Sequence, residues 1–157
     1  MITSVSKAAL AAVVALGIGA AYAQDVSRDF DWSLLDSRMA QVHEAMDAED
    51  WIDAARLLVR IVADTPDDAD AYTYLGRSYR RLGEPEQALI YYDHALRLRP
   101  DHRGALVELG TFYVDMNRLV EAEALLARLG RVCGADCDAY RTLEQVVLQH
   151  KAAHPRG

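Results

Sequence analysis

The chain resembles itself when it is shifted along its own sequence so that Leu75 falls on Leu109, and this shift is called here the repeat period. Other residues of the same kind then coincide: Gly76 with Gly110, Tyr79 with Tyr113, Ala88 with both Ala54 and Ala122, and Pro100 with Pro66. Large apolar residues also fall on large apolar residues, as Tyr92 does on Leu58 and Leu126. Self-similarity at one fixed period predicts a repeat architecture, in which each unit buries its apolar side against the next.

The spacing of apolar residues predicts helices. After Ala23 they recur three and four positions apart, which is the helical period, and no alternating runs rich in Val, Ile and Thr predict strands. Short polar breaks place Pro66, Pro85 and Pro100 at helix edges, where proline is tolerated. We therefore expect an all-α chain with about seven helices of about 12 to 16 residues.

The middle unit, "AYTYLGRSYRRLGEPEQALIYYDHALRLRP", has the spacing of a known repeat family. Its defining positions are Tyr72, Leu75, Gly76, Tyr79, Ala88, Tyr92, Ala95 and Pro100. The third unit keeps Leu106, Leu109, Gly110, Tyr113 and Ala122, and the first unit keeps the pattern only in its second helix, at Ala54, Leu58, Ile61 and Pro66. On these residues the chain resembles the tetratricopeptide repeat family, as a small exported bacterial member.

The resemblance implies an α-solenoid of about three helical hairpins followed by a capping helix. Within residues 34–136 the repeats would span about 35–68, 69–102 and 103–136, followed by the capping helix at 137–152 and a flexible tail at 153–157. Small residues would let the two helices of a hairpin approach closely, Gly76 with Ala88 and Gly110 with Ala122. Tyr79 and Tyr92 would fill the space beside that contact.

The first 23 residues read as a cleaved export signal. Lys7 precedes an apolar run that is too short to span a membrane, and "AYA" supplies the small residues that signal peptidase reads. An uncleaved anchor is the alternative. We expect a mature chain that starts at Gln24 with an extension over 24–33, lies in the periplasm or is secreted, and has no stable membrane insertion after cleavage.

Charge and missing motifs exclude several classes of function. The net charge of −7 opposes general nucleic-acid binding, which needs a positive field around phosphates. The chain has no phosphate loop, HExxH or GxSxG motif, so we expect neither an enzyme nor a cofactor. His94 and His102, near Asp93 and Asp101, and the pair His150 and His154 are interpreted as surface residues, and no metal site is predicted.

In this family the first helix of each repeat lines a concave groove. The resemblance places Met39, His43, Met46, Thr73, Arg77, Arg80, Arg81, Val107, Thr111 and Val114 there. Arg77, Arg80 and Arg81 share one helical face, and their guanidinium groups would bind carboxylates of an acidic partner segment. The alternative is a solvated face that is partly neutralised by the nearby Asp67, Asp68 and Asp70.

Cys133 and Cys137 are the two cysteines of the chain. In an exported protein an even number of cysteines predicts oxidation, and this pair falls where the third repeat meets the capping helix. We expect a structural disulfide, with a metal or redox-active pair and free thiols as alternatives.

The leading function is a periplasmic adaptor or assembly factor that binds a protein or peptide partner, with self-association as a further possibility. The rival is a redox or metal-handling accessory protein that acts through the cysteines.

Overall fold

The structure is a computed structural model that describes residues 32–154, with side chains from residue 37 onward. The predicted signal peptide, most of the predicted 24–33 extension and the last three residues of the predicted tail lie outside the described residues. Ala153, which we assigned to the tail, is the last residue of a helix. Trp32 and Ser33, which we assigned to the extension, are the first two residues of a helix.

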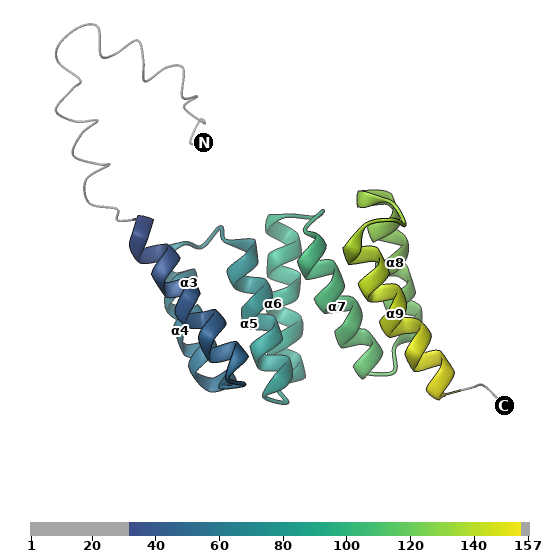
Figure 1. Cartoon of the computed structure of the whole chain (residues 1–157), viewed down its shortest axis with the longest axis horizontal. Helices are drawn as coiled ribbons and strands as arrows, with labels where there is room; N and C mark the ends of the chain where they lie inside the picture. Colours follow the sequence, from purple (N-terminus) through teal and green to yellow (C-terminus); the bar gives the residue numbers. More distant parts are fainter. Residues whose placement is uncertain (1–31, 155–157) are drawn as a thin grey trace, which may run out of the picture. The chain divides into compact units, whose positions relative to one another are not determined.

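The described part of the chain folds into seven helices with no strand, as the sequence predicts (Figure 1). In order they are α3 (Trp32–Asp47), α4 (Trp51–Asp64), α5 (Ala69–Arg81), α6 (Pro85–Leu98), α7 (Arg103–Asp115), α8 (Leu119–Cys133) and α9 (Asp138–Ala153). The predicted α-solenoid of helical hairpins is confirmed: α5 pairs with α6, α7 pairs with α8, and α9 covers α7 and α8. No described helix is long and apolar enough to cross a membrane.

The turns inside the three hairpins are built alike. Each has one residue in the left-handed region: Glu49 with φ 57°, Gly83 with φ 78° and Asn117 with φ 57°. In each hairpin the following N–H donates to a carbonyl five residues earlier: Asp50 to Ala45 at 2.8 Å, Glu84 to Tyr79 at 2.9 Å and Arg118 to Tyr113 at 2.7 Å. This is the backbone pattern that ends a helix in a Schellman motif, so the repeat period includes the turns as well as the helices.

Local side chains also fix where the second and third hairpins begin. The Asp68 carboxylate accepts a hydrogen bond from the N–H of Ala71 at 3.0 Å and so caps α5. Pro85 occupies the first turn of α6, where its missing N–H costs nothing. At α7 the cap is His102, whose Nδ1 accepts from the N–H of Ala105 at 3.0 Å. These caps separate helices that the apolar period alone would not divide.

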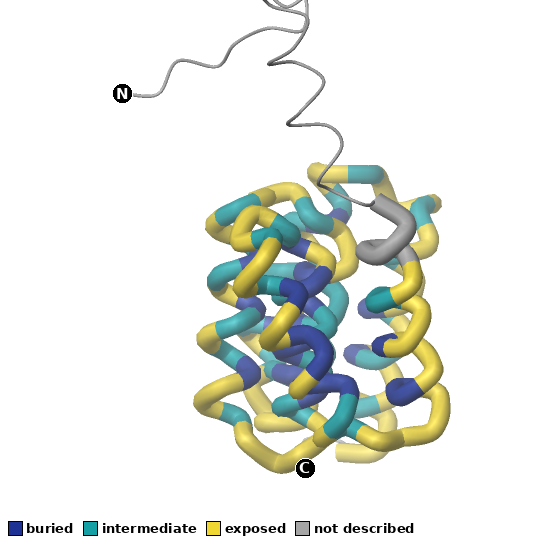
Figure 2. Tube along the Cα trace, turned by 90° about the vertical axis from the view of Figure 1, so that its left-hand side faces the viewer, coloured by how far each residue is buried: buried dark blue, intermediate teal, exposed yellow. Residues whose placement is uncertain are grey.

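The core lies between two layers, one of first helices (α3, α5, α7, α9) and one of second helices (α4, α6, α8). Buried positions concentrate on the inward sides of the helices (Figure 2). The residues that carry the repeat pattern are mostly buried: Leu75, Gly76, Ala88, Tyr92, Ala95, Leu109, Gly110 and Ala122. Tyr79 and Tyr113 are half-buried, and Pro100 is exposed in the turn after α6.

Gly76 allows the closest approach inside the second hairpin. A β-carbon at this position would lie 2.7 Å from two carbons of the Tyr92 ring, which is itself fully buried. The predicted role of Gly76 at the crossing of α5 with α6 therefore has a direct geometric cause. The ring of Tyr92 occupies the volume that a side chain at position 76 would need.

Gly110 has a different neighbour from the one we expected. A β-carbon there would lie 2.5 Å from Cδ2 of Leu143 on α9, so the nearest contact is with the capping helix and not with Ala122 on α8. Leu143 follows Leu109 by one repeat period. The capping helix thus occupies the place that the first helix of a fourth repeat would take.

We predict opposite effects for the same substitution at two helical glycines. Gly76→Ala should lower the free energy of unfolding by about 1–3 kcal/mol, because the added methyl group displaces the buried ring of Tyr92. Gly130→Ala, in α8, should leave it unchanged or raise it by up to about 1 kcal/mol, because its β-carbon would lie 3.4 Å from Tyr140, an ordinary contact. Urea denaturation followed by circular dichroism measures both. Equal stability of the two variants would contradict the packing described here.

Candidate functional site

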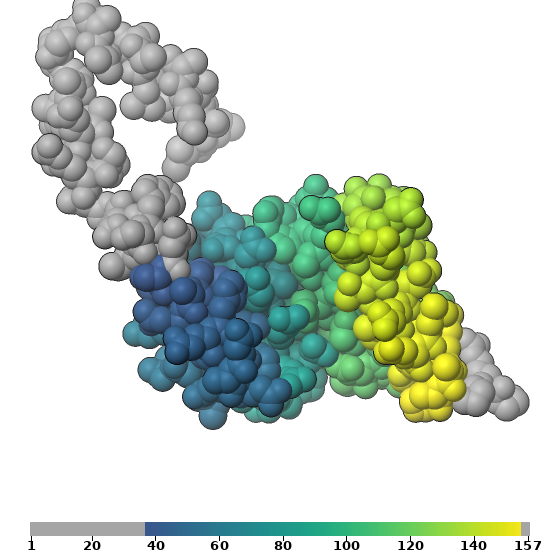
Figure 3. Space-filling model, viewed as in Figure 1, coloured from purple at the N-terminus to yellow at the C-terminus, as the bar shows by residue number. Residues whose placement is uncertain are grey.

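The surface formed by the exposed sides of α3, α5, α7 and α9 is called here the first-helix face, and Figure 3 shows it. Helix α7 packs on both α5 and α9, so these three first helices are neighbours. On α3, the exposed ring of His43 meets the ring of Tyr74 on α5 edge-on, with 5.3 Å between centroids. The face therefore carries groups from successive repeats side by side.

A charged cluster joins α5 to α7 on this face. Arg77 Nη2 lies 2.5 Å from Glu108 Oε1, and Arg80 Nη2 lies 3.5 Å from Glu108 Oε2. Arg80 Nη1 also lies 2.5 Å from Asp115 Oδ2. The Glu108 side chain is 12% exposed, so its carboxylate sits largely out of water between the two guanidinium groups. This cluster ties the second repeat to the third.

Arg81 makes the corresponding tie to the first repeat. Its Nη2 lies 3.2 Å from Glu49 Oε1, and its guanidinium carbon lies 4.9 Å from the centre of the Trp51 ring. Guanidinium groups stack favourably on aromatic faces, and the same group can also pair with a carboxylate in its plane. Arg81 is thereby held in a defined position although it is exposed.

Tyr92 lies beneath this cluster. Burial raises the pKa of its phenol, the nearby Glu108 raises it further, and Arg80 opposes both effects. Burial alone would lower the pKa of Arg80, but Tyr92, Asp115 and Glu108 outweigh it and raise that pKa above its ordinary value. At neutral pH the pair is therefore a neutral phenol and a charged guanidinium.

Three residues predicted for the groove are buried, and these predictions are wrong. Thr73 is 4% exposed, and its hydroxyl donates to the carbonyl of Ala69 at 2.7 Å. Met46 and Val114 are core residues. All three are buried, so they are not available to contact a partner.

The other predicted groove residues reach the surface to different extents. Arg77, Arg80, Val107, Thr111 and Met39 are half-buried, whereas Arg81 and His43 are exposed. Val107 and Met39 pack against core clusters, and the Thr111 hydroxyl donates to the carbonyl of Val107 at 2.9 Å. His43, Arg77 and Arg81 are thus the predicted residues with the most surface to offer.

The carboxylates that neutralise the arginines are not those we expected. Asp68 caps α5, and Asp70 pairs with Arg99 at 2.9 Å and lies 2.8 Å from Nε2 of His102. We did not predict the actual partners, Glu49, Glu108 and Asp115, or the ring contact between the half-buried Tyr74 and the exposed His43. Glu108 follows Tyr74, and Asp115 follows Arg81, by one repeat period, but this equivalence does not show which side chains meet across the repeats.

The histidines have structural surroundings. Since Nδ1 of His102 accepts from the backbone, its Nε2 carries the proton and donates to Asp70, linking α7 to α5. The His94 ring lies against Tyr72 with 4.0 Å between centroids, and Nε2 of His150 lies 2.9 Å from Asn117 Oδ1. Among residues 37–154, no group of three or more His, Cys, Asp or Glu side chains is arranged to hold a metal ion.

Cys133 and Cys137 form a disulfide at the junction of α8 and α9, with 5.9 Å between their Cα atoms. Cys133 is the last residue of α8. Cys137 is the N-cap of α9, and its sulfur accepts from the N–H of Tyr140 at 3.4 Å. The disulfide therefore joins the end of α8 to the start of α9 and restrains the capping helix.

Comparison with protein families and solved structures gives one consistent result. Two models of the tetratricopeptide repeat match the chain, one over residues 39–102 and one over residues 83–147. No curated protein matches it. Together the two models reach from α3 into α9 and so cover every hairpin described above.

Similar solved structures include peptide complexes. PcrH in complex with the chaperone-binding region of PopD is 18% identical, has a TM-score of 0.66, and the match covers 79% of this chain and 93% of that chain. The type III secretion chaperone SycD of Yersinia enterocolitica, in complex with a peptide of the translocator YopD, is 14% identical with a TM-score of 0.67, over 80% and 95% of the two chains. The Sgt2 repeat domain of Aspergillus fumigatus is 21% identical with a TM-score of 0.64, over 78% and 85%. At these identities the likeness shows the fold.

We predict that Glu108→Gln destabilises the fold, because it leaves Arg77 without its ion pair and Arg80 with Asp115 alone. Since Glu108 is mostly buried while Arg77 remains partly in solvent, the free energy of unfolding should fall by roughly 1–3 kcal/mol. Urea denaturation measures the change. Glu44→Gln, at an exposed position on α3, is the matched control and should differ from wild type by less than about 0.5 kcal/mol. Equal effects of the two substitutions would contradict the proposed role of the cluster.

We also predict that the double substitution Cys133→Ser/Cys137→Ser lowers the free energy of unfolding by about 2 kcal/mol, because the disulfide restricts the unfolded chain. Denaturation of wild type with and without a reductant provides the comparison, and the reduced wild type should match the variant. Native protein from an oxidising compartment should resist alkylation and weigh two hydrogens less than the reduced form. Rapid alkylation of the native protein would rule out this assignment.

Proposed function

We propose, from the premise that this chain belongs to the tetratricopeptide repeat family, that it is a protein-binding adaptor or assembly factor. It acts by holding a segment of a partner protein and not by catalysis. The partner would lie on the first-helix face, across α3, α5 and α7. The observation that carries this proposal is the fixed row of polar and aromatic groups that successive repeats present there: His43 with Tyr74, then Arg77 with Glu108.

The arginines retain donors for a partner. A guanidinium has five N–H donors, and Arg77 has one carboxylate neighbour while its side chain is 40% exposed. Arg81 is 45% exposed with Glu49 as its carboxylate partner. Each can therefore donate to a backbone carbonyl or a carboxylate of a bound segment without losing its internal pair. Because the cluster is already neutralised, an acidic partner is not required, and we expect backbone carbonyl groups to be the main acceptors.

The two peptide-complex structures support the class of function. Both PcrH and SycD are described in complex with a segment of another protein, and each aligns with most of this chain. Peptide binding by an array of this size is thus within the capacity of the fold. The identity of the partner does not carry over from PcrH or SycD, because sequence identity to both is low. The residues on the first-helix face determine which segment this chain binds.

We place the protein in the periplasm of a bacterium, or outside the cell. The basis is the sequence of residues 1–23, which has the parts of an export signal. A disulfide between Cys133 and Cys137 fits this location, because disulfides persist in oxidising compartments. Because the array is short, a second copy of the chain would extend the first-helix face, so the oligomeric state in solution should be measured.

Capture of a partner tests this proposal. Immobilised protein is incubated with periplasmic extract, and bound proteins are identified by mass spectrometry. The variant His43→Ala/Arg77→Ala/Arg81→Ala removes the exposed groups of the first-helix face, and we expect it to retain roughly tenfold less of at least one captured protein. The matched control His154→Ala/Arg56→Ala/Arg60→Ala removes the same residue types at exposed positions after the end of α9 and on α4, and it should capture as wild type does.

The variant Cys133→Ser/Cys137→Ser separates the rival function. Under the adaptor proposal it binds the same partner, with at most the loss of stability described above. Capture of the same proteins in equal amounts by His43→Ala/Arg77→Ala/Arg81→Ala and by its matched control would contradict the proposal. A partner lost only from the cysteine variant would point to the redox or metal-handling function.

A further inference from the structure

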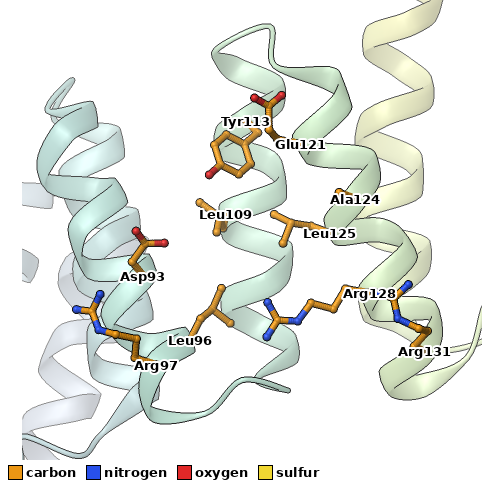
Figure 4. Close-up of a pocket in the computed structure, with 10 residues that line it drawn as sticks. All are labelled: Asp93, Leu96, Arg97, Leu109, Tyr113, Glu121, Ala124, Leu125, Arg128 and Arg131. Carbon is orange, nitrogen blue, oxygen red and sulfur yellow. The ribbon is translucent and has the colours of Figure 1, made fainter.

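A recess with its own chemistry lies between α6, α7 and α8, apart from the cluster of the first-helix face (Figure 4). Its volume is about 490 Å³. Leu96 from α6, Leu109 from α7 and Leu125 from α8 converge in its middle, with Tyr113 beside them. An apolar floor shared by three helices can receive an apolar side chain of a partner.

Arginines border this apolar floor. Arg97 comes from α6, while Arg128 and Arg131 come from α8, and Figure 4 shows Arg97 at the α6 edge of the recess and the other two at its α8 edge. Arg128 donates to the carbonyl oxygen of Pro100, which holds its guanidinium at the recess. Within residues 37–154, none of the three lies within ion-pair distance of a carboxylate.

The arginines of the recess are paired differently from those of the first-helix face. There, Arg77, Arg80 and Arg81 each have a carboxylate partner, so the face is internally neutralised. Here Arg97 and Arg131 make no ion pair with a described residue, and Asp93, one turn before Arg97 on α6, is the carboxylate nearest to it along the helix, in a chain whose net charge is −7. Unpaired guanidinium groups beside an apolar surface complement a segment that carries both carboxylates and a large apolar side chain.

The acidic residues of the recess restrict the occupant further. Glu121 accepts two hydrogen bonds from Arg118, at 2.8 and 2.6 Å, so it adds little net charge. Asp93 lines the α6 side of the recess and makes no ion pair with any residue that the structure describes. A polyanion such as a nucleic acid would meet Asp93 as well as the arginines, whereas a short acidic peptide can place its few carboxylates at the arginines alone.

We propose that this recess is a second binding surface, for an acidic peptide segment of a partner protein. A large apolar side chain of the segment packs on Leu96, Leu109 and Leu125. Carboxylates on either side of it bind Arg97 at the α6 edge and Arg131 at the α8 edge. The surface is independent of the first-helix face, so a single copy of the chain can hold two segments at once, as an adaptor that bridges partners would.

Selection from a phage-displayed library of random dodecapeptides tests the proposal. Phage are selected on wild-type protein after depletion on the variant Arg97→Gln/Arg131→Gln, and the enriched peptides are synthesised for fluorescence anisotropy. We expect them to carry net negative charge and at least one large apolar residue. The variant Arg97→Gln/Arg131→Gln should weaken their binding by about tenfold or more, and raising the salt concentration should weaken binding to wild type.

Two further variants locate the site. Ala124 is exposed and lines the recess, so Ala124→Glu should repel the same peptides while circular dichroism shows an unchanged fold. The double variant Arg60→Gln/Arg103→Gln removes the same charge from exposed arginines that lie outside the recess, and it should bind within about twofold of wild type.

The proposal is overturned by the absence of enriched peptides, by enriched peptides without negative charge, or by equal losses in Arg97→Gln/Arg131→Gln and Arg60→Gln/Arg103→Gln. Peptides that bind the recess variants normally but fail on His43→Ala/Arg77→Ala/Arg81→Ala would overturn the second surface while supporting the adaptor function of the first.

Discussion

The ring of Tyr92 lies against the backbone of Gly76, and the rest of the array depends on that contact. Tyr92 is fully buried, and a β-carbon on Gly76 would lie 2.7 Å from its ring. The contact sets how closely α5 approaches α6. It thereby places α5 beside α7, where Arg80 meets Asp115 across the repeat boundary. In a repeat array each unit is stabilised mainly by its neighbours, so one close approach inside a hairpin also positions the surface formed between hairpins.

The ion pairs that join the repeats have a functional consequence. Arg77, Arg80 and Arg81 are restrained by Glu108, Asp115 and Glu49 before any partner arrives. Side chains that are already ordered lose less conformational entropy on binding, so a partner segment meets a prepared surface. Arg97 and Arg131, at the recess between α6 and α8, have no such partners among the described residues, so their charge is available to a ligand. The same fold therefore presents a neutralised polar face and a cationic recess, suited to different chemistries.

The repeat pattern predicted the helices and most of the buried positions because one unit, read well at residues 72–100, could be transferred along the chain by whole repeat periods. The repeat pattern did not predict which side chains contact one another between repeats. Glu108 as the partner of Arg77 depends on the rotation between successive hairpins, which spacing within one helix does not contain. Thr73 was misplaced for the same reason, since the side of α5 that it occupies is covered by packing. The left-handed turn residues Glu49, Gly83 and Asn117 were not predicted, although glycine and asparagine are residue types that often adopt positive φ.

The central claim is that a partner protein is bound on the first-helix face, and photo-crosslinking in living cells tests it most directly. A benzophenone amino acid is introduced at position 43, 60 or 111 of otherwise unaltered protein. His43 and Thr111 belong to the first-helix face, whereas Arg60 is exposed on α4 in the other layer. The account predicts adducts with the same partner from positions 43 and 111 and none from position 60. Adducts with that partner from position 60 alone, or no adducts from positions 43 and 111, would contradict it.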